Sequence, residues 1–116
     1  MFQFALRPLR RWLLAGSLAA TSTACAASAA PPADARAAVA AGATLLDVRT
    51  PGEFAAGHLP GAINIPIEQL PVRLGDLVAA APIVVYCRSG RRSAAAARIL
   101  AGDGRAVVDL GAMSNW

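Results

Sequence analysis

The chain has 116 residues, which is enough for one hydrophobic core and too short for two domains. Its 11 basic residues are all Arg and outnumber the 7 acidic ones, but three of these Arg lie in residues 1–11. The remainder is close to neutral and does not indicate a nucleic-acid partner. Two Cys without a CxxC pair, together with a single His, also exclude a structural zinc site.

The first 29 residues have the features of a secretory signal peptide in the usual order. Three Arg within residues 7–11 precede an apolar run over 12–20, and small residues lead to Ala27-Ser28-Ala29. The apolar run is shorter than the roughly 20 residues that a membrane span needs. We therefore predict export, to the periplasm in a Gram-negative source, with no membrane span after cleavage near Ala29. The domain assignment is a signal peptide at 1–29, a linker at 30–35 and a folded domain at 36–116.

Three alternatives to a cleaved secretory signal peptide remain for the N-terminal segment. Arg10-Arg11 would suit a twin-Arg signal, although the flanking residues match that pattern poorly, and the segment could instead stay uncleaved as an anchor. Cys25 would suit lipidation, although Ser22 stands where an aliphatic residue is preferred. Cleavage near Ala29 removes Cys25, so that the mature chain keeps Cys87 as its only thiol.

Short apolar runs alternate with helical patterns along the rest of the chain. In chain order the pattern predicts a helix at 35–41, a strand at 44–48, a turn or helix start at 50–53, a loop at 57–61, a short strand at 62–66, a helix at 67–80, a strand at 82–86, a polar loop at 87–92, a helix at 93–101 and a strand at 106–110. Strands that alternate with helices predict an α/β fold on a parallel sheet.

Cys87 is the main candidate for chemistry, because ligands of parallel α/β sheets bind at the carboxyl ends of the strands. Gly90 allows the loop to curl so that backbone amides converge, and a helix N-terminus and Arg side chains add positive charge. We expect a partly solvated loop, a Cys87 thiolate with a pKa below its ordinary value, and an anionic substrate. The alternative is a buried, inert Cys followed by a solvated Arg-rich loop.

Three motifs in this order resemble the single-domain rhodaneses, which are thiosulfate sulfurtransferases and sulfane-sulfur carriers. They are Leu45–Phe54 (LLDVRTPGEF), Gly57–Pro66 (GHLPGAINIP) and Ile83–Ser93 (IVVYCRSGRRS), and the resemblance spans about residues 36–116. It implies a rhodanese-like three-layer fold, with a five-stranded, mainly parallel sheet and helices on both faces. It also implies that Cys87 carries a persulfide, with no cofactor required.

The same resemblance assigns roles to the residues around Cys87. Arg49, Arg88 and Ser89 are expected to bind the substrate anion, with Gly90, Arg91 and Arg92 as additions, while Asp47 and Ser93 are structural. An ion pair of Arg49 with an acid such as Asp47 or Glu53 is the competing role for that residue. His58 is expected to make a structural hydrogen bond, and Phe54 and Trp116 to be core or cap residues.

The expected partners are a small anionic sulfur donor and a thiol or cyanide acceptor, with a protein as a further candidate acceptor. A rhodanese-like carrier or binding module with little turnover is the non-enzymatic alternative. A Cys-dependent phosphatase or arsenate reductase is the rival enzyme class. Protein tyrosine phosphatases need Cys-x5-Arg, whereas here the sixth residue after Cys87 is Ser93 and Arg92 is the fifth.

Overall fold

Four parallel strands form the sheet that positions the site. In the computed structural model, which describes residues 31–116, the strand order is β2-β1-β3-β4. The strands are β1 (Thr44–Asp47), β2 (Ile63–Asn64), β3 (Ile83–Cys87) and β4 (Val107–Ala112). The predicted parallel α/β fold is confirmed. The fifth strand implied by the resemblance is not found among residues 31–116, where helices, 3-10 turns and loops connect the four strands.

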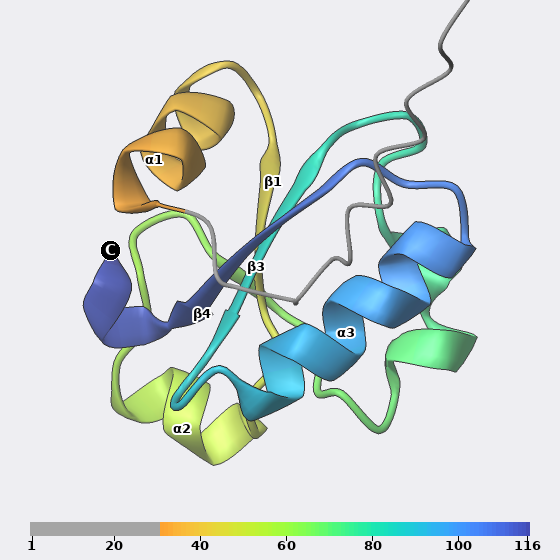
Figure 1. Cartoon of the computed structure of the whole chain (residues 1–116). Coiled ribbons are helices and arrows are strands. Elements are labelled where there is room, and N and C mark those ends of the chain that lie inside the picture. The colour runs from red at the N-terminus through yellow and green to blue at the C-terminus, as the bar shows by residue number, and fades with distance from the viewer. Residues whose placement is uncertain (1–30) are drawn as a thin grey trace, which may run out of the picture.

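Helices cover both faces of the sheet and its carboxyl edge. Helix α1 (Pro32–Ala40) lies on one face and α3 (Arg91–Gly102) on the other, and the short α2 (Pro51–Ala56) lies near the end of the sheet where β3 ends (Figure 1). β3 is buried along its whole length because it lies between two strands and under both helical layers.

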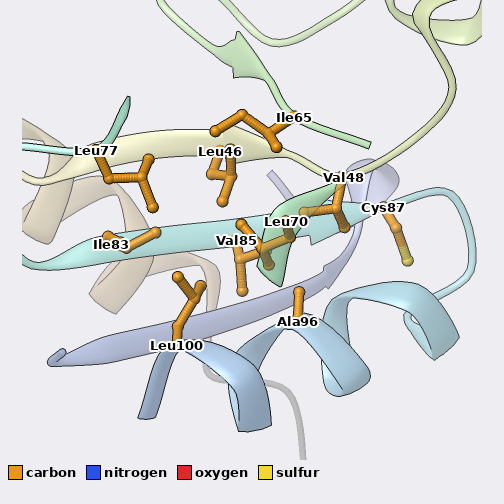
Figure 2. Packing of buried hydrophobic residues seen from close by; sticks show 10 residues of the cluster. All are labelled: Leu46, Val48, Ile65, Leu70, Leu77, Ile83, Val85, Cys87, Ala96 and Leu100. Atoms are coloured by element: carbon orange, nitrogen blue, oxygen red, sulfur yellow. The ribbon is translucent and has the colours of Figure 1, made fainter. Parts of the chain in front are cut away.

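The pleat of β3 divides the core into two clusters. Ile83, Val85 and Cys87 face α3 and pack with Leu46, Val48, Leu70, Ala96 and Leu100, as Figure 2 shows. Val84 and Tyr86 face the opposite way and pack with Ala35 of α1 and with Leu110. The sulfur of Cys87 therefore lies on the α3 side of the sheet, at the carboxyl end of the strand.

The helix predicted over 67–80 is wrong. The segment forms two single 3-10 turns instead, η1 (Leu70–Val72) and η2 (Leu74–Asp76). Pro71 lacks the amide hydrogen that a helix interior needs, and Gly75 weakens the next turn. Leu70 and Leu77 still reach the core, whereas Val78, which the pattern placed on the same face, is 66% exposed.

Several boundaries near the site move relative to the predictions. Cys87 is the last residue of β3 rather than the first of the loop, and α3 begins at Arg91, so that Arg91 and Arg92 belong to its first turn. β4 extends to Ala112 with an irregularity in its pairing beside Tyr86, which brings Gly111 next to Gly90.

The predictions for the N-terminal segment concern residues that the structure does not describe. The predicted signal peptide over 1–29, its cleavage near Ala29 and the lipidation alternative at Cys25 lie outside the described residues. Within residues 31–116, no helix is long and apolar enough to cross a membrane. The stretch described above as a linker is partly helical, since α1 begins at Pro32 with proline in its favoured first-turn position.

Candidate active site

Cys87 ends the central strand β3 and faces the start of α3. The side chain is fully buried, although the loop that follows it is partly solvated as expected. Its Sγ accepts a hydrogen bond from the Gly90 amide at 2.9 Å. The residues between them, Arg88 and Ser89, are exposed, so the loop curls around the sulfur with its side chains outward and its backbone inward.

The curl of this loop depends on Gly90 and Ser93. Gly90 has a φ of 98° and a ψ of −13°, which is a left-handed conformation that other L-residues adopt only with strain. The Ser93 hydroxyl donates to the Gly90 carbonyl at 3.0 Å and thereby ties the loop to the first turn of the helix. Ser93, which the sequence predicts to have a structural role near the site, is fully buried.

The pKa of Cys87 is lowered from its ordinary value, which is the predicted direction. Burial opposes this shift and raises the pKa, because a buried thiolate loses its solvation. The amides of Ser93, Gly90 and Ser89 and the neighbouring Ser93 side chain lower the pKa, and together they outweigh burial. The thiolate is therefore stabilised mainly by backbone amides at the start of α3.

Arg49 and Asp47 form a buried ion pair at the carboxyl end of β1. Asp47 is fully buried and accepts from Arg49 Nε at 2.9 Å and Nη2 at 2.6 Å, while the Arg49 amide donates to Asp47 Oδ1 at 2.8 Å. Nη2 also donates to the Gly57 carbonyl at 2.7 Å. The Asp47 hydrogen bond raises the pKa of Arg49, and burial counteracts it only in part. The competing ion-pair role of Arg49 is therefore present, with Asp47 as partner.

Arg92 is held by Glu53, a residue 39 positions earlier in the chain. Arg92 Nη1 and Nη2 donate to the two carboxylate oxygens of Glu53 at 2.8 and 3.1 Å. Glu53 also completes a capping box with Thr50 at the start of α2. The Arg92 hydrogen bonds lower the pKa of Glu53 to about 2, and they raise the pKa of Arg92.

A shallow pocket lies beside the Cys87 loop at the same edge of the sheet. It has a volume of about 280 Å³ and is lined by Arg49, Glu53, Ala56, Gly57, Arg88 and Met113. Arg88 and Arg91 are exposed, and neither has an acidic partner among the described residues. The pocket thus offers two guanidinium groups, Arg49 and Arg88, to an anion that approaches the edge of the sheet.

The remaining singled-out residues take structural positions. His58 Nδ1 lies 2.9 Å from the Phe54 carbonyl oxygen, and the two rings stack with centroids 3.8 Å apart. Trp116 is half-buried against the core cluster on the α1 side of the sheet, and the Arg36 guanidinium lies 5.4 Å from its ring centroid. Among residues 31–116, no group of three His, Cys, Asp or Glu side chains gathers as a metal site.

Sequence reasoning missed three supporting residues. Glu53 was considered only as a partner of Arg49, although the Thr-x-x-Glu spacing from Thr50 is a recognisable capping-box signal. Asn64 Nδ2 donates to the carbonyls of Asp47 and Arg49 at 3.0 Å, which fixes the end of β1. Met113 reaches the pocket only because β4 ends beside the loop, and no local pattern indicates this.

A parallel α/β sheet with a buried, ionisable Cys in an amide-lined loop at the end of its central strand is the architecture of the rhodanese-like fold. The chain matches the Rhodanese family, described as the Rhodanese-like domain, over residues 31–116. It therefore belongs to this family, and several of its relatives are named as sulfurtransferases.

Individual relatives support this assignment. A sulfurtransferase of Allochromatium vinosum is 38% identical over 74 residues, covering 62% of this chain and 69% of that protein. The thiosulfate sulfurtransferase GlpE of Stutzerimonas stutzeri is 38% identical over 78 residues, covering 64% and 68%. The structure of the human single-domain sulfurtransferase TSTD1 superposes with a TM-score of 0.65 at 29% identity, covering 72% and 89%. Across these and other curated relatives, the chain spans from 20% to 70% of their length.

Proposed function

We propose that the protein is a thiosulfate sulfurtransferase that carries sulfane sulfur as a persulfide on Cys87. The observation that carries the proposal is the hydrogen bond of 2.9 Å from the Gly90 amide to Sγ at the start of α3. It accompanies a lowered pKa, so the nucleophile is available without a separate general base. Relatives named as thiosulfate sulfurtransferases give independent support.

The reaction proceeds in two balanced steps. The Cys87 thiolate attacks the outer sulfur of thiosulfate, a new S–S bond forms, and the original S–S bond breaks as sulfite leaves with the electron pair. An acceptor such as cyanide or a thiolate then attacks the outer sulfur of the persulfide. That step releases thiocyanate or a new persulfide and restores the Cys87 thiolate. A protein thiol is an alternative acceptor, and neither step requires a cofactor.

The anionic donor is bound at the edge of the sheet. Arg49 and Arg88 line the pocket beside the loop, and Arg88 and Arg91 are exposed cations close to Cys87 in sequence. The amides of Ser89 and Gly90 stabilise negative charge on the attacking sulfur and then on the persulfide. Because the charge of Arg49 is balanced by Asp47 and its Nη2 already contacts the Gly57 carbonyl, Arg88 and Arg91 supply the net positive charge that attracts the donor.

Intact mass spectrometry of the full chain before and after thiosulfate tests the proposal. The chain has two Cys, so Cys25→Ser and Cys87→Ser are matched variants. We expect the native protein and Cys25→Ser to gain the mass of one sulfur atom, and Cys87→Ser to gain none. Transfer to cyanide should follow the same pattern. Sulfur gained by Cys87→Ser, or not gained by Cys25→Ser, would overturn the proposal.

We also propose that the protein is exported and processed near Ala29. The supporting features are the Arg-bearing start, the apolar run over 12–20 and the small residues before the cleavage position. N-terminal sequencing of the protein from its native host tests this proposal. A protein that still begins at Met1 in the cytoplasm would contradict it.

A further inference from the structure

The ion pair between Glu53 and Arg92 joins α2 to the first turn of α3. Glu53 lies on α2, a helix of six residues with no fully buried side chain. Arg92 lies in the first turn of α3, whose N-terminal residues shape the sulfur site. The contact is bidentate, at 2.8 and 3.1 Å, and both side chains are only about 30% exposed, at 27% and 31%. Such a paired geometry fixes orientation as well as distance.

Arg92 connects the ion pair to the sulfur site, because it lies in the first turn of α3 next to Ser93. Arg92 immediately precedes Ser93, whose hydroxyl donates to the Gly90 carbonyl and whose amide favours the Cys87 thiolate. A shift of the first turn of α3 would therefore move the donors that face the sulfur. Both terminal nitrogens of Arg92 are engaged by Glu53, so the guanidinium acts through the helix rather than as a free ligand for an anion.

We propose that Glu53 is a positioning residue for sulfur transfer, which acts through Arg92 to hold the first turn of α3 so that the backbone amides of the loop remain directed at the Cys87 sulfur. This inference rests on the proposed function for its role in transfer. Its structural content, the direction of donors at Cys87, is independent of the substrate.

The capping box allows the two roles of Glu53 to be separated. In Glu53→Gln, the amide oxygen in place of Oε1 still accepts from Thr50 and from Arg92 Nη1, because Gln serves in a capping box. The amide nitrogen in place of Oε2 faces the donor Nη2 of Arg92, and the negative charge of the pair is lost. In Thr50→Ala, the hydroxyl cap is lost and the pair with Arg92 remains. Arg98→Ala, on the exposed face of α3, controls for removal of a positive charge from the same helix.

The experiment measures the alkylation rate of Cys87 against pH on the full chain with Cys25→Ser, so that Cys87 is the only thiol. We expect Glu53→Gln and Arg92→Ala to slow alkylation by about 3- to 10-fold at pH values below the apparent pKa, through a rise of that pKa by half a unit to one unit. The double variant should be no slower than either single variant, because the two residues act as one unit. Thr50→Ala and Arg98→Ala should keep the native pH profile, whatever their melting temperatures.

A native profile for Glu53→Gln and Arg92→Ala would overturn the inference, as would a shift of equal size in Thr50→Ala. If Glu53→Gln does not fold, Arg92→Lys provides the test, since Lys keeps the charge and cannot make the paired contact. Sulfur uptake by mass spectrometry separates the two proposals. If the native protein takes up sulfur and Glu53→Gln keeps the native pH profile of alkylation, only the positioning role of Glu53 is refuted. A shifted Glu53→Gln profile without uptake by the native protein removes only the sulfurtransferase assignment.

Discussion

Replacement of Asp47 by Asn should strongly destabilise the fold, because Asp47 is the only acid that neutralises the buried Arg49 among the described residues. The carboxylate is fully buried, and Arg49 is 5% exposed. In Asp47→Asn, Oδ1 still accepts from the Arg49 amide. The new amide nitrogen, however, replaces Oδ2, which receives Nε at 2.9 Å and Nη2 at 2.6 Å. A guanidinium that is already out of water then faces another donor and loses its counter-charge.

The expected loss in the free energy of unfolding is about 3–5 kcal/mol, the usual cost of removing one partner of a buried pair. A domain of this size melts about 4–8 °C lower for each kcal/mol lost, so the melting temperature should fall by roughly 12 °C or more. Arg49 keeps its bond to the Gly57 carbonyl, which places the expected loss nearer the lower end of this range.

Urea unfolding followed by circular dichroism measures the loss, with an unchanged m-value as the check that the unfolded state is the same. Asp103→Asn is a matched control, because Asp103 also pairs with the Nε of the Arg two residues later, at 2.9 Å, but is 40% exposed. It should cost about 1 kcal/mol or less. If Asp47→Asn also costs less than about 1 kcal/mol, the reasoning from burial is refuted.

Three further outcomes are expected. Ser93→Ala should raise the Cys87 pKa toward that of a free thiol, which reduces the thiolate fraction at neutral pH. The rate of Cys87 alkylation against pH measures this pKa, and an unchanged midpoint would contradict the prediction. Tyr86→Phe should cost about 1–3 kcal/mol in urea unfolding, because the buried hydroxyl accepts from the Leu59 amide at 3.1 Å and Phe leaves that donor unpaired. A cost near zero would mean that the amide finds another acceptor. Glu53 has a pKa lowered to about 2, so its pairing stabilises the fold fully above its unfolded pKa of about 4.3 and is lost as the pH falls toward 2. The melting temperatures of native protein and Glu53→Gln should therefore converge across this range, and a constant difference would argue against the ion pair.

The alternation of strands and helices and the place of the catalytic candidate follow from local sequence. β1, β3 and β4 appear where short apolar runs predict them, because a strand buried on both faces needs apolar side chains at successive positions. Cys87 lies at the carboxyl end of the central strand as expected, and Gly90 adopts the left-handed conformation that only glycine accepts easily. Each of these features depends on neighbours within a few residues, so the sequence carries a visible signal for it.

The helix predicted over 67–80 demonstrates the limit of periodicity. Leu70, Leu74 and Leu77 recur at helical spacing because they cover the same core cluster, and two 3-10 turns present them to it as well as a helix would. The pattern predicts which side chains are buried. It does not predict the backbone conformation, because Pro71 prevents a hydrogen bond that a continuous helix would need.

Only the tertiary structure determines which acid pairs with each Arg at the site. Arg49 had two candidate acids in its own motif, and the fold gives it Asp47, since α2 directs Glu53 toward the start of α3. The Glu53–Arg92 ion pair connects two segments that are distant in sequence. The burial of Cys87 at the end of β3 depends on α3, which belongs to a different layer. Such contacts depend on how the helices pack on the sheet, a sum of many weak interactions across the whole core that leaves no local pattern in the chain.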